Sequence, residues 1–230
     1  RDAQESRGLG DVYKRQLKQR LHGTKLIIIS ARSALRNYPD LAQTLTPLGE
    51  EIDSLEGFMG AILDHAKVES LAMDVQLRTV EIQSLFQNLD LQLEKTARSK
   101  SVALNFRYTP IKIGSDAAML HRILSNLISN ALKFTRPHGK VLVNARKSAG
   151  SVLIQVWDQG PGIKPDAHER IFEAFHQEHA DAKMDNQGYG LGLSIVKNLA
   201  DSLGYKIKIK SKLGRGTCFT VHVPDGFFLR

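Results

Sequence analysis

Cysteine is almost absent from this chain, with only Cys218 among its 230 residues. A single thiol excludes a disulfide within one chain and a metal site built on several thiolates, and it favours a reducing compartment such as the cytosol. Long apolar runs are also missing, because the longest, Leu26–Ile29, has four residues. A membrane helix needs about 20, so the sequence predicts no membrane span.

Charge is unevenly distributed between the two signs. The 32 Lys and Arg outnumber the 24 Asp and Glu, which gives a formal net charge of +8. This excess can be a solvated basic surface without a specific role, or it can serve an acidic partner or a polyanionic ligand. Aromatic residues make up 7% and do not alternate with the lysines, so we expect no nucleic-acid partner.

The first residues have no pattern that continues into the rest of the chain. DVYKRQ at 11–16 resembles the translated end of a transposon used to prepare sequencing libraries. We therefore expect residues 1–16 to be a sequencing artefact and exclude them from fold reasoning. On this interpretation the natural polypeptide begins near Leu17, and the segment that precedes it is missing.

Residues 17–72 are expected to form a helical hairpin. NYPD at 37–40 suits its turn, and Thr46 with Pro47 suits the start of its second helix. Apolar residues then recur at a heptad spacing. Since two amphipathic helices cannot bury both of their stripes, a second copy completing a four-helix bundle predicts a homodimer. The alternative is packing against the chain's own second domain. The heptad positions are Leu48, Ile52, Leu55, Met59, Ile62 and Ala66.

Residues 73–226 change period and indicate a second domain. Period-two alternation predicts strands, among them KVLVNAR at 140–146 and SVLIQVWD at 151–158, and amphipathic stretches predict helices, among them 116–134. The predicted fold class is α+β: a helical hairpin, forming a dimeric four-helix bundle, followed by a two-layer α/β sandwich with a mixed, mostly antiparallel sheet.

The helix expected at 116–134 carries a polar stripe beside its apolar face. Asn126, Asn130 and Lys133 are spaced i, i+4 and i+7, so they lie on one side of the helix. Such a stripe usually just faces solvent. The motifs downstream make a binding role the stronger interpretation.

The first of these motifs is DQGPG at 158–162. Asp158 ends an apolar strand, where its carboxylate can accept a hydrogen bond from an exocyclic amine. Gly160 and Gly162 allow turns closed to other residues and the close approach of a flat ligand. Thr217, in GRGTCF, can hydrogen-bond a ligand, although it can equally be an ordinary strand threonine.

The second motif is GYGLG at 188–192, directly before a predicted helix. Gly188, Gly190 and Gly192 free backbone N–H groups to face an anion at the positive helix end. No G-K-[ST] comes after it, and the motif does not follow a strand in a βαβ unit, so neither a Walker loop nor a dinucleotide fingerprint is indicated.

The order of these motifs resembles the nucleotide-binding domain of sensor histidine kinases, within the wider Bergerat-fold (GHKL) ATPases. ILSNLISNALKFT resembles their N box, VWDQGPGI the first glycine box, RIFEAFHQ the F box and NQGYGLGLSIVK the second glycine box. ILDHAKVES is similar to the end of their second dimerisation helix. The resemblance covers about 45–224.

The resemblance implies ATP and Mg²⁺ as cofactors of an ATP-binding catalytic domain at 73–226. Asn130, with Asn126 beside it, would hold the metal, Lys133 would meet the phosphates during catalysis, and Asp158 would accept from the adenine amine. An ATP lid would span 163–187. The nucleotide-binding set that it implies is Asn126, Asn130, Lys133, Asp158, Gly160, Gly162, Gly188, Gly190, Gly192 and Thr217.

The lid implied by the resemblance would hinge on the glycines of the second box. Phe172 and Phe175 would pack it against the core or the hairpin, with simple core packing as the alternative.

The activity implied is autophosphorylation of a histidine, followed by transfer to an aspartate on the receiver domain of a response regulator. The chain would be the cytoplasmic portion of a longer protein, whose upstream sensor domain is missing here. The full-length protein can be anchored in the inner membrane. His22 is the only histidine of the first helix, but Gly23 follows it where the family pattern has an acidic residue.

Because of that departure, a degenerate ATP-binding dimer, acting as a regulator or phosphatase without autophosphorylation, is the main alternative. A chaperone- or topoisomerase-like ATPase is disfavoured, because its helix would carry a glutamate to activate water.

Overall fold

A computed structural model describes residues 75–148, 150–176 and 190–224, and scattered positions between 23 and 35. The chain divides into two compact units, residues 1–66 and 67–230. In the first unit the described positions from 23 to 34 are helical. The rest of the predicted hairpin at 17–72 lies outside the described residues. Within the described parts, none of the helices combines the length and apolar content that a bilayer crossing demands.

The second unit alternates helices with strands. The strands predicted at 140–146 and 151–158 and the helix predicted at 116–134 are present. In chain order the elements are β1 (Arg78–Glu81), α4 (Ile82–Ser99), β2 (Ala103–Arg107), β3 (Lys112–Ser115), α5 (Ala117–Phe134), β4 (Lys140–Ser148), β5 (Ser151–Trp157), the 3-10 helices η1 (Pro165–Ala167) and η2 (Arg170–Phe172), α6 (Gly192–Ser202), β6 (Lys206–Lys212) and β7 (Gly216–Pro224).

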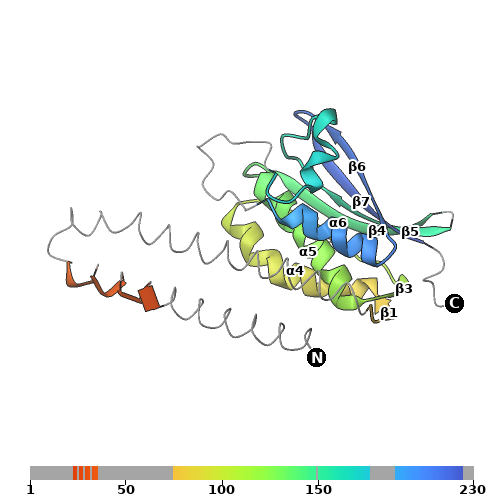
Figure 1. The fold of residues 1–230 in the computed structure, drawn as a ribbon, viewed down its shortest axis with the longest axis horizontal. Helices are drawn as coiled ribbons and strands as arrows, with labels where there is room; N and C mark the ends of the chain where they lie inside the picture. The colour runs from red at the N-terminus through yellow and green to blue at the C-terminus, as the bar shows by residue number, and fades with distance from the viewer. Residues whose placement is uncertain are drawn as a thin grey trace, which may run out of the picture. The chain divides into compact units, whose positions relative to one another are not determined.

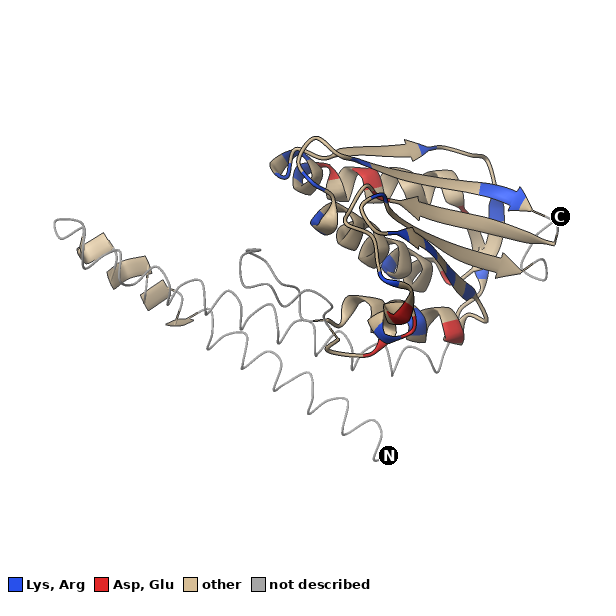
Figure 2. Ribbon diagram, turned by 90° about the horizontal axis from the view of Figure 1, so that it is seen from above, with Lys and Arg blue, Asp and Glu red and all other residues tan. Residues whose placement is uncertain are grey.

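The main sheet has five strands in the order β2-β4-β5-β7-β6, and β1 pairs with β3 in a separate two-stranded sheet. β2 and β4 run parallel, whereas β4–β5, β5–β7 and β6–β7 are antiparallel. Helices α4, α5 and α6 form a layer over one face of the sheet (Figure 1), and the view from above shows the same two layers (Figure 2). This confirms the α+β class for the second unit.

The core lies between these two layers. On the sheet, every second residue of a strand faces the helices, and Val141, Val143, Ile154 and Val221 are fully buried there. On the helix side, α5 buries Met119, Leu120, Ile123, Leu124, Leu127, Ile128, Ala131 and Leu132. Each large aliphatic side chain removed from water in this way contributes about 1.5–3 kcal/mol.

The start of α5 is fixed by Asp116. Its carboxylate accepts from the backbone N–H groups of Ala118 at 3.0 Å and Met119 at 3.1 Å, as an N-cap does. Just before it, the buried hydroxyl of Tyr205 lies 2.8 Å from Ser115 Oγ. The first turn of α5 is therefore held both by its own cap and by a residue 90 positions away.

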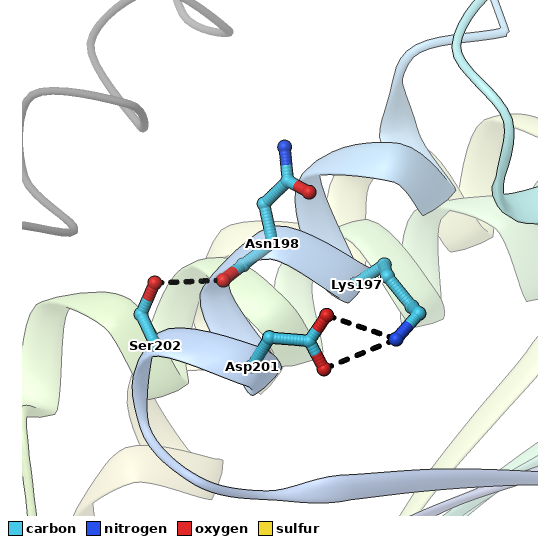
Figure 3. Close-up of polar contacts among 4 residues, drawn as sticks. All are labelled: Lys197, Asn198, Asp201 and Ser202. Carbon is cyan, nitrogen blue, oxygen red and sulfur yellow. Dashed lines mark hydrogen bonds and ion pairs between the residues drawn. The ribbon is translucent and has the colours of Figure 1, made fainter.

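Among the described residues, the outward side of α6 is held by contacts within the helix itself. Lys197 Nζ lies 3.1 and 2.9 Å from the two carboxylate oxygens of Asp201, and Ser202 Oγ donates to the carbonyl of Asn198 at 2.8 Å (Figure 3). Both partners of the ion pair are about half exposed, so it is worth about 0.3–0.5 kcal/mol. The position of α6 therefore depends on its buried face.

Candidate functional site

The polar stripe of α5 does not face open solvent. Asn126, Asn130 and Lys133 are all half-buried. Asn126 donates through Nδ2 to the carbonyl of Arg122 at 2.9 Å, which fixes the orientation of its amide. The helix thus presents two amide groups and an ammonium in a partly dry environment.

The first residue of α6 lies directly beside these amides. A Cβ atom placed on Gly192 would be 3.3 Å from Asn126 Oδ1 and 3.6 Å from Asn130 Nδ2. Two motifs about 60 residues apart in the chain, the amide stripe and the second glycine box, therefore meet at one point. The oxygens of such amides are hard, neutral donors of the kind that Mg²⁺ accepts, and the N-terminal end of a helix favours negative charge.

Lys133 completes the stripe. Its Nζ lies 4.9 Å from the ring centroid of Phe134. Burial, and secondarily the positive charge of Lys100, lower the pKa of Lys133 from its ordinary value. An anion that contacted this ammonium would offset both effects.

Asp158, at the end of β5, is anchored to β7. Its Oδ1 accepts from the N–H of Gly160 at 2.8 Å and of Thr217 at 3.2 Å, and its own N–H donates to the carbonyl of Thr217 at 2.9 Å. Burial raises the pKa of Asp158, while the two backbone donors act in the opposite direction. No other hydrogen bond reaches this carboxylate from the described residues, so Oδ2 remains available to a donor.

Three glycines bring the backbone close around Asp158. Gly160 comes near the end of α5, since a Cβ there would lie 3.1 Å from the carbonyl oxygen of Phe134 and 2.8 Å from Asp158 Oδ1. Gly162 and Gly216 have φ values of +78° and +108°, which residues with a side chain rarely adopt. A Cβ on Gly216 would collide with the carbonyl of Asp158.

Comparison with known proteins shows the family of this domain. Residues 115–226 match the family described as "Histidine kinase-, DNA gyrase B-, and HSP90-like ATPase". The sensor histidine kinase TmoS of Ectopseudomonas mendocina is 34% identical over 168 residues, or 72% of this chain. This chain carries a histidine kinase catalytic domain. The Staphylococcus aureus sensor protein SrrB is 25% identical over 186 residues, or 80% of this chain.

Solved histidine kinases have the same fold as this catalytic domain. ShkA, crystallised at full length with AMPPNP, superposes with a TM-score of 0.71 at 28% identity and covers 97% of this chain. ThkA in complex with the response regulator TrrA gives 0.66 at 20% identity over 96% of this chain and 64% of its own. The chain spans only 17% of TmoS, 32% of SrrB and 46% of ShkA.

The F box and the second glycine box of the catalytic domain meet through their backbones. Phe175 donates its N–H to the carbonyl of Gly190 at 3.1 Å, and both residues have positive φ. Phe172 is half-buried, whereas Phe175 is 60% exposed. Phe175 therefore does not pack in the core.

The predicted lid at 163–187 is described only up to residue 176. That part contains η1 and η2 and buries Ala167 and Ile171, so it packs on the catalytic domain. His22 and Gly188 lie outside the described residues.

Sequence reasoning missed Ser211. Its Oγ accepts from the N–H of Ile163 at 2.8 Å, donates to the carbonyl of Gly216 at 3.1 Å and lies 2.9 Å from Thr217 Oγ1. It therefore joins the first glycine box to the start of β7. The available signal was the alternation of β6, which places Ser211 on the same side as Ile207 and Ile209.

Proposed function

We propose that this chain is the catalytic portion of a sensor histidine kinase. It binds Mg²⁺-ATP, phosphorylates a histidine on a homodimeric hairpin at 17–72 and passes the phosphoryl group to an aspartate of a response-regulator receiver domain. The observation that carries the proposal is the meeting of Asn126 and Asn130 with Gly192 at the start of α6. The AMPPNP complex of ShkA and the regulator complex of ThkA support it.

The residues present suit a metal-bound triphosphate. Oδ1 atoms of Asn130 and Asn126 would bind Mg²⁺, which, when bound, would neutralise charge on the phosphates. Lys133 would contact phosphate oxygens as a point charge, and the contact would relieve the unfavourable burial that lowers its pKa. Gly192 leaves the space beside both amides that a side chain would fill.

Asp158 would bind the base of the nucleotide. With Oδ1 held by two backbone N–H groups, Oδ2 can accept from the exocyclic amine of adenine. Gly160, Gly162 and Thr217 would surround the same base, and Gly188 and Gly190 would hinge the lid at 163–187. An amine donating to Asp158 favours the ionised carboxylate, so binding would lower its pKa.

Phosphoryl transfer would use His22 as the acceptor. A ring nitrogen would form the N–P bond while the bond from the γ-phosphorus to its bridging oxygen breaks, ADP leaves and the ring gives up a proton. Positioning and charge neutralisation supply most of the rate acceleration in such reactions. The first helix of the hairpin exposes three large apolar side chains in the single chain: Leu26, Ile27 and Ile29. Their exposure supports burial of this helix against a second copy.

Calorimetry with Mg²⁺ and AMPPNP tests the nucleotide site. We expect Asn130→Ala to weaken binding at least tenfold, because it removes a metal ligand. Asn198→Ala, on the outward side of α6, is the matched control and should change affinity less than about twofold. A folded wild-type protein that releases no heat, or an Asn130→Ala variant that binds as wild type does, refutes the proposal.

A second candidate is a dimeric regulator or phosphatase that binds ATP without phosphorylating itself. The observation favouring it is Gly23, which stands where an acidic residue would assist proton removal from His22. Incubation with ATP labelled at the γ-phosphate separates the two. An acid-labile, alkali-stable label that is lost in His22→Gln and kept in His65→Gln supports the kinase, whereas intact nucleotide binding without a label supports the regulator.

A further inference from the structure

The sheet face opposite the helices has a composition unlike the rest of the domain. Strand register places Lys206, His222, Leu153 and Arg146 in one row across four strands of this face. The neighbouring row on the same face, two residues further along each strand, contains Lys208, Thr220, Gln155, Asn144 and Arg107. We name the basic residues of this surface the basic sheet face: Arg107, Lys140, Arg146, Lys206, Lys208, Lys210 and Lys212.

No acidic residue occupies an outward position on these five strands. All seven basic side chains are exposed, and none forms an ion pair with a residue that the structure describes. Their fields reach the residues between them, since Lys208, Arg146 and Lys206 each contribute to lowering the pKa of His222, after burial. Figure 2 shows Lys and Arg in blue along the strands.

Protection of a sheet edge explains only part of this pattern. β6 is an edge strand, and lysines on edge strands discourage pairing with other chains. However, Lys140 and Arg146 belong to β4, which lies between β2 and β5. The positive charge therefore extends across the sheet, over roughly 20 Å along β6 and a similar width across five strands.

The chemistry of the face discriminates between anionic partners. Five of its seven cations are lysines, which act as compact, strongly hydrated point charges, and lysine is depleted in the cores of protein interfaces. Binding of single-stranded nucleic acid uses several stacking aromatics, but Trp157 is the one aromatic residue at an outward position on the described strands. Trp157 is 42% exposed. Clusters of 4–8 Lys and Arg attract anionic lipid headgroups, and tryptophan is enriched at membrane–water interfaces.

We propose that the basic sheet face is a docking surface for an anionic phospholipid bilayer, with Trp157 at the interface. Docking there leaves the helix layer, with Asn126 and Asn130, on the opposite side of the sheet. The inference is independent of histidine phosphorylation, because it concerns a different surface.

Vesicle flotation with the full chain tests the proposal. We expect wild type to float with vesicles containing about one-third phosphatidylglycerol and not with pure phosphatidylcholine vesicles, and we expect binding to fall as salt rises. Each lysine near such a surface is worth about fivefold in partitioning. The quadruple variant Lys206→Gln, Lys208→Gln, Lys210→Gln and Lys212→Gln should therefore lose about several-hundred-fold.

A charge-matched control carries Lys95→Gln, Arg98→Gln, Lys164→Gln and Lys197→Gln and should bind vesicles within a few fold of wild type. Trp157 is the single tryptophan of the chain, so a blue shift of tryptophan emission on binding reports contact through this face. Circular dichroism and urea unfolding check that both variants are folded.

Three results overturn the proposal: absence of wild-type flotation, equal losses in both quadruple variants, or flotation with unchanged tryptophan emission. The proposal is also overturned if anionic vesicles leave the tryptophan emission unchanged while a single-stranded oligonucleotide or an acidic receiver domain shifts it. That result assigns the basic sheet face to the partner that shifts the emission.

Discussion

The contact between Gly216 and Asp158 allows a quantitative test of the nucleotide site. An alanine at Gly216 must adopt a φ of +108°, which costs about 1–2 kcal/mol and is partly offset by about 0.4–1 kcal/mol from restriction of the unfolded chain. Its Cβ would also lie 2.9 Å from the carbonyl carbon of Asp158 and 3.0 Å from Cα of Gln159. Overpacking of this kind adds about 1–3 kcal/mol, so Gly216→Ala should destabilise the domain by about 2–4 kcal/mol.

Gly214→Ala is the matched control. It also has positive φ, at +74°, but a Cβ there meets nothing within 4 Å. Gly214→Ala should therefore lower the free energy of unfolding by about 1 kcal/mol or less, which is the cost of the positive φ minus the gain from restricting the unfolded chain.

Urea unfolding and calorimetry with AMPPNP measure both effects. Because Gly216→Ala displaces the backbone of Asp158, nucleotide affinity should fall about tenfold or more, while Gly214→Ala should stay within about twofold of wild type. Equal stabilities of the two variants, or wild-type affinity in Gly216→Ala, would refute the reasoning.

Further predictions concern single side chains. Burial raises the pKa of Asp158, so the protonated carboxyl favours the folded state. This contribution to stability is full below about pH 3.9, the unfolded pKa, and is lost as pH rises through the folded pKa. Asp158→Asn should therefore unfold at higher urea than wild type at pH 7, with the difference vanishing in acid, while nucleotide affinity falls in calorimetry. Lys133→Met should weaken nucleotide binding about tenfold to hundredfold, because a charge-assisted hydrogen bond is worth about 1.5–3 kcal/mol; Lys95→Met, on exposed α4, should not. Tyr205→Phe removes the buried bond to Ser115 and should lower the free energy of unfolding by about 1 kcal/mol in urea titration, and an unchanged midpoint would contradict this.

Local pattern predicted most of the second unit. Period-two alternation in β4 and β5 and the apolar face of α5 reflect burial on one side of each element, so these elements could be found from the sequence. The cap at Asp116 could be expected from its position before an apolar helix. The polar stripe of α5 could be recognised as a candidate site because two glycine motifs follow it in the chain.

Contacts that depend on strand register could not be predicted. Ser211 reaches Thr217 and Ile163 only because β6 pairs with β7 in one register. The bond between Tyr205 and Ser115 joins residues 90 positions apart. Phe175 is exposed and has a positive φ, and no periodicity reveals either feature.

The attachment of Asp158 to Thr217 has a consequence for biosynthesis. Both the backbone and the carboxylate of Asp158 are held by Thr217 on β7, and β7 is the last of the described strands to leave the ribosome. The helix with its amides can form early, but the aspartate cannot be oriented until residue 217 has emerged and paired with β5. Orientation of the aspartate therefore waits for β7, whatever the order in which the helices form.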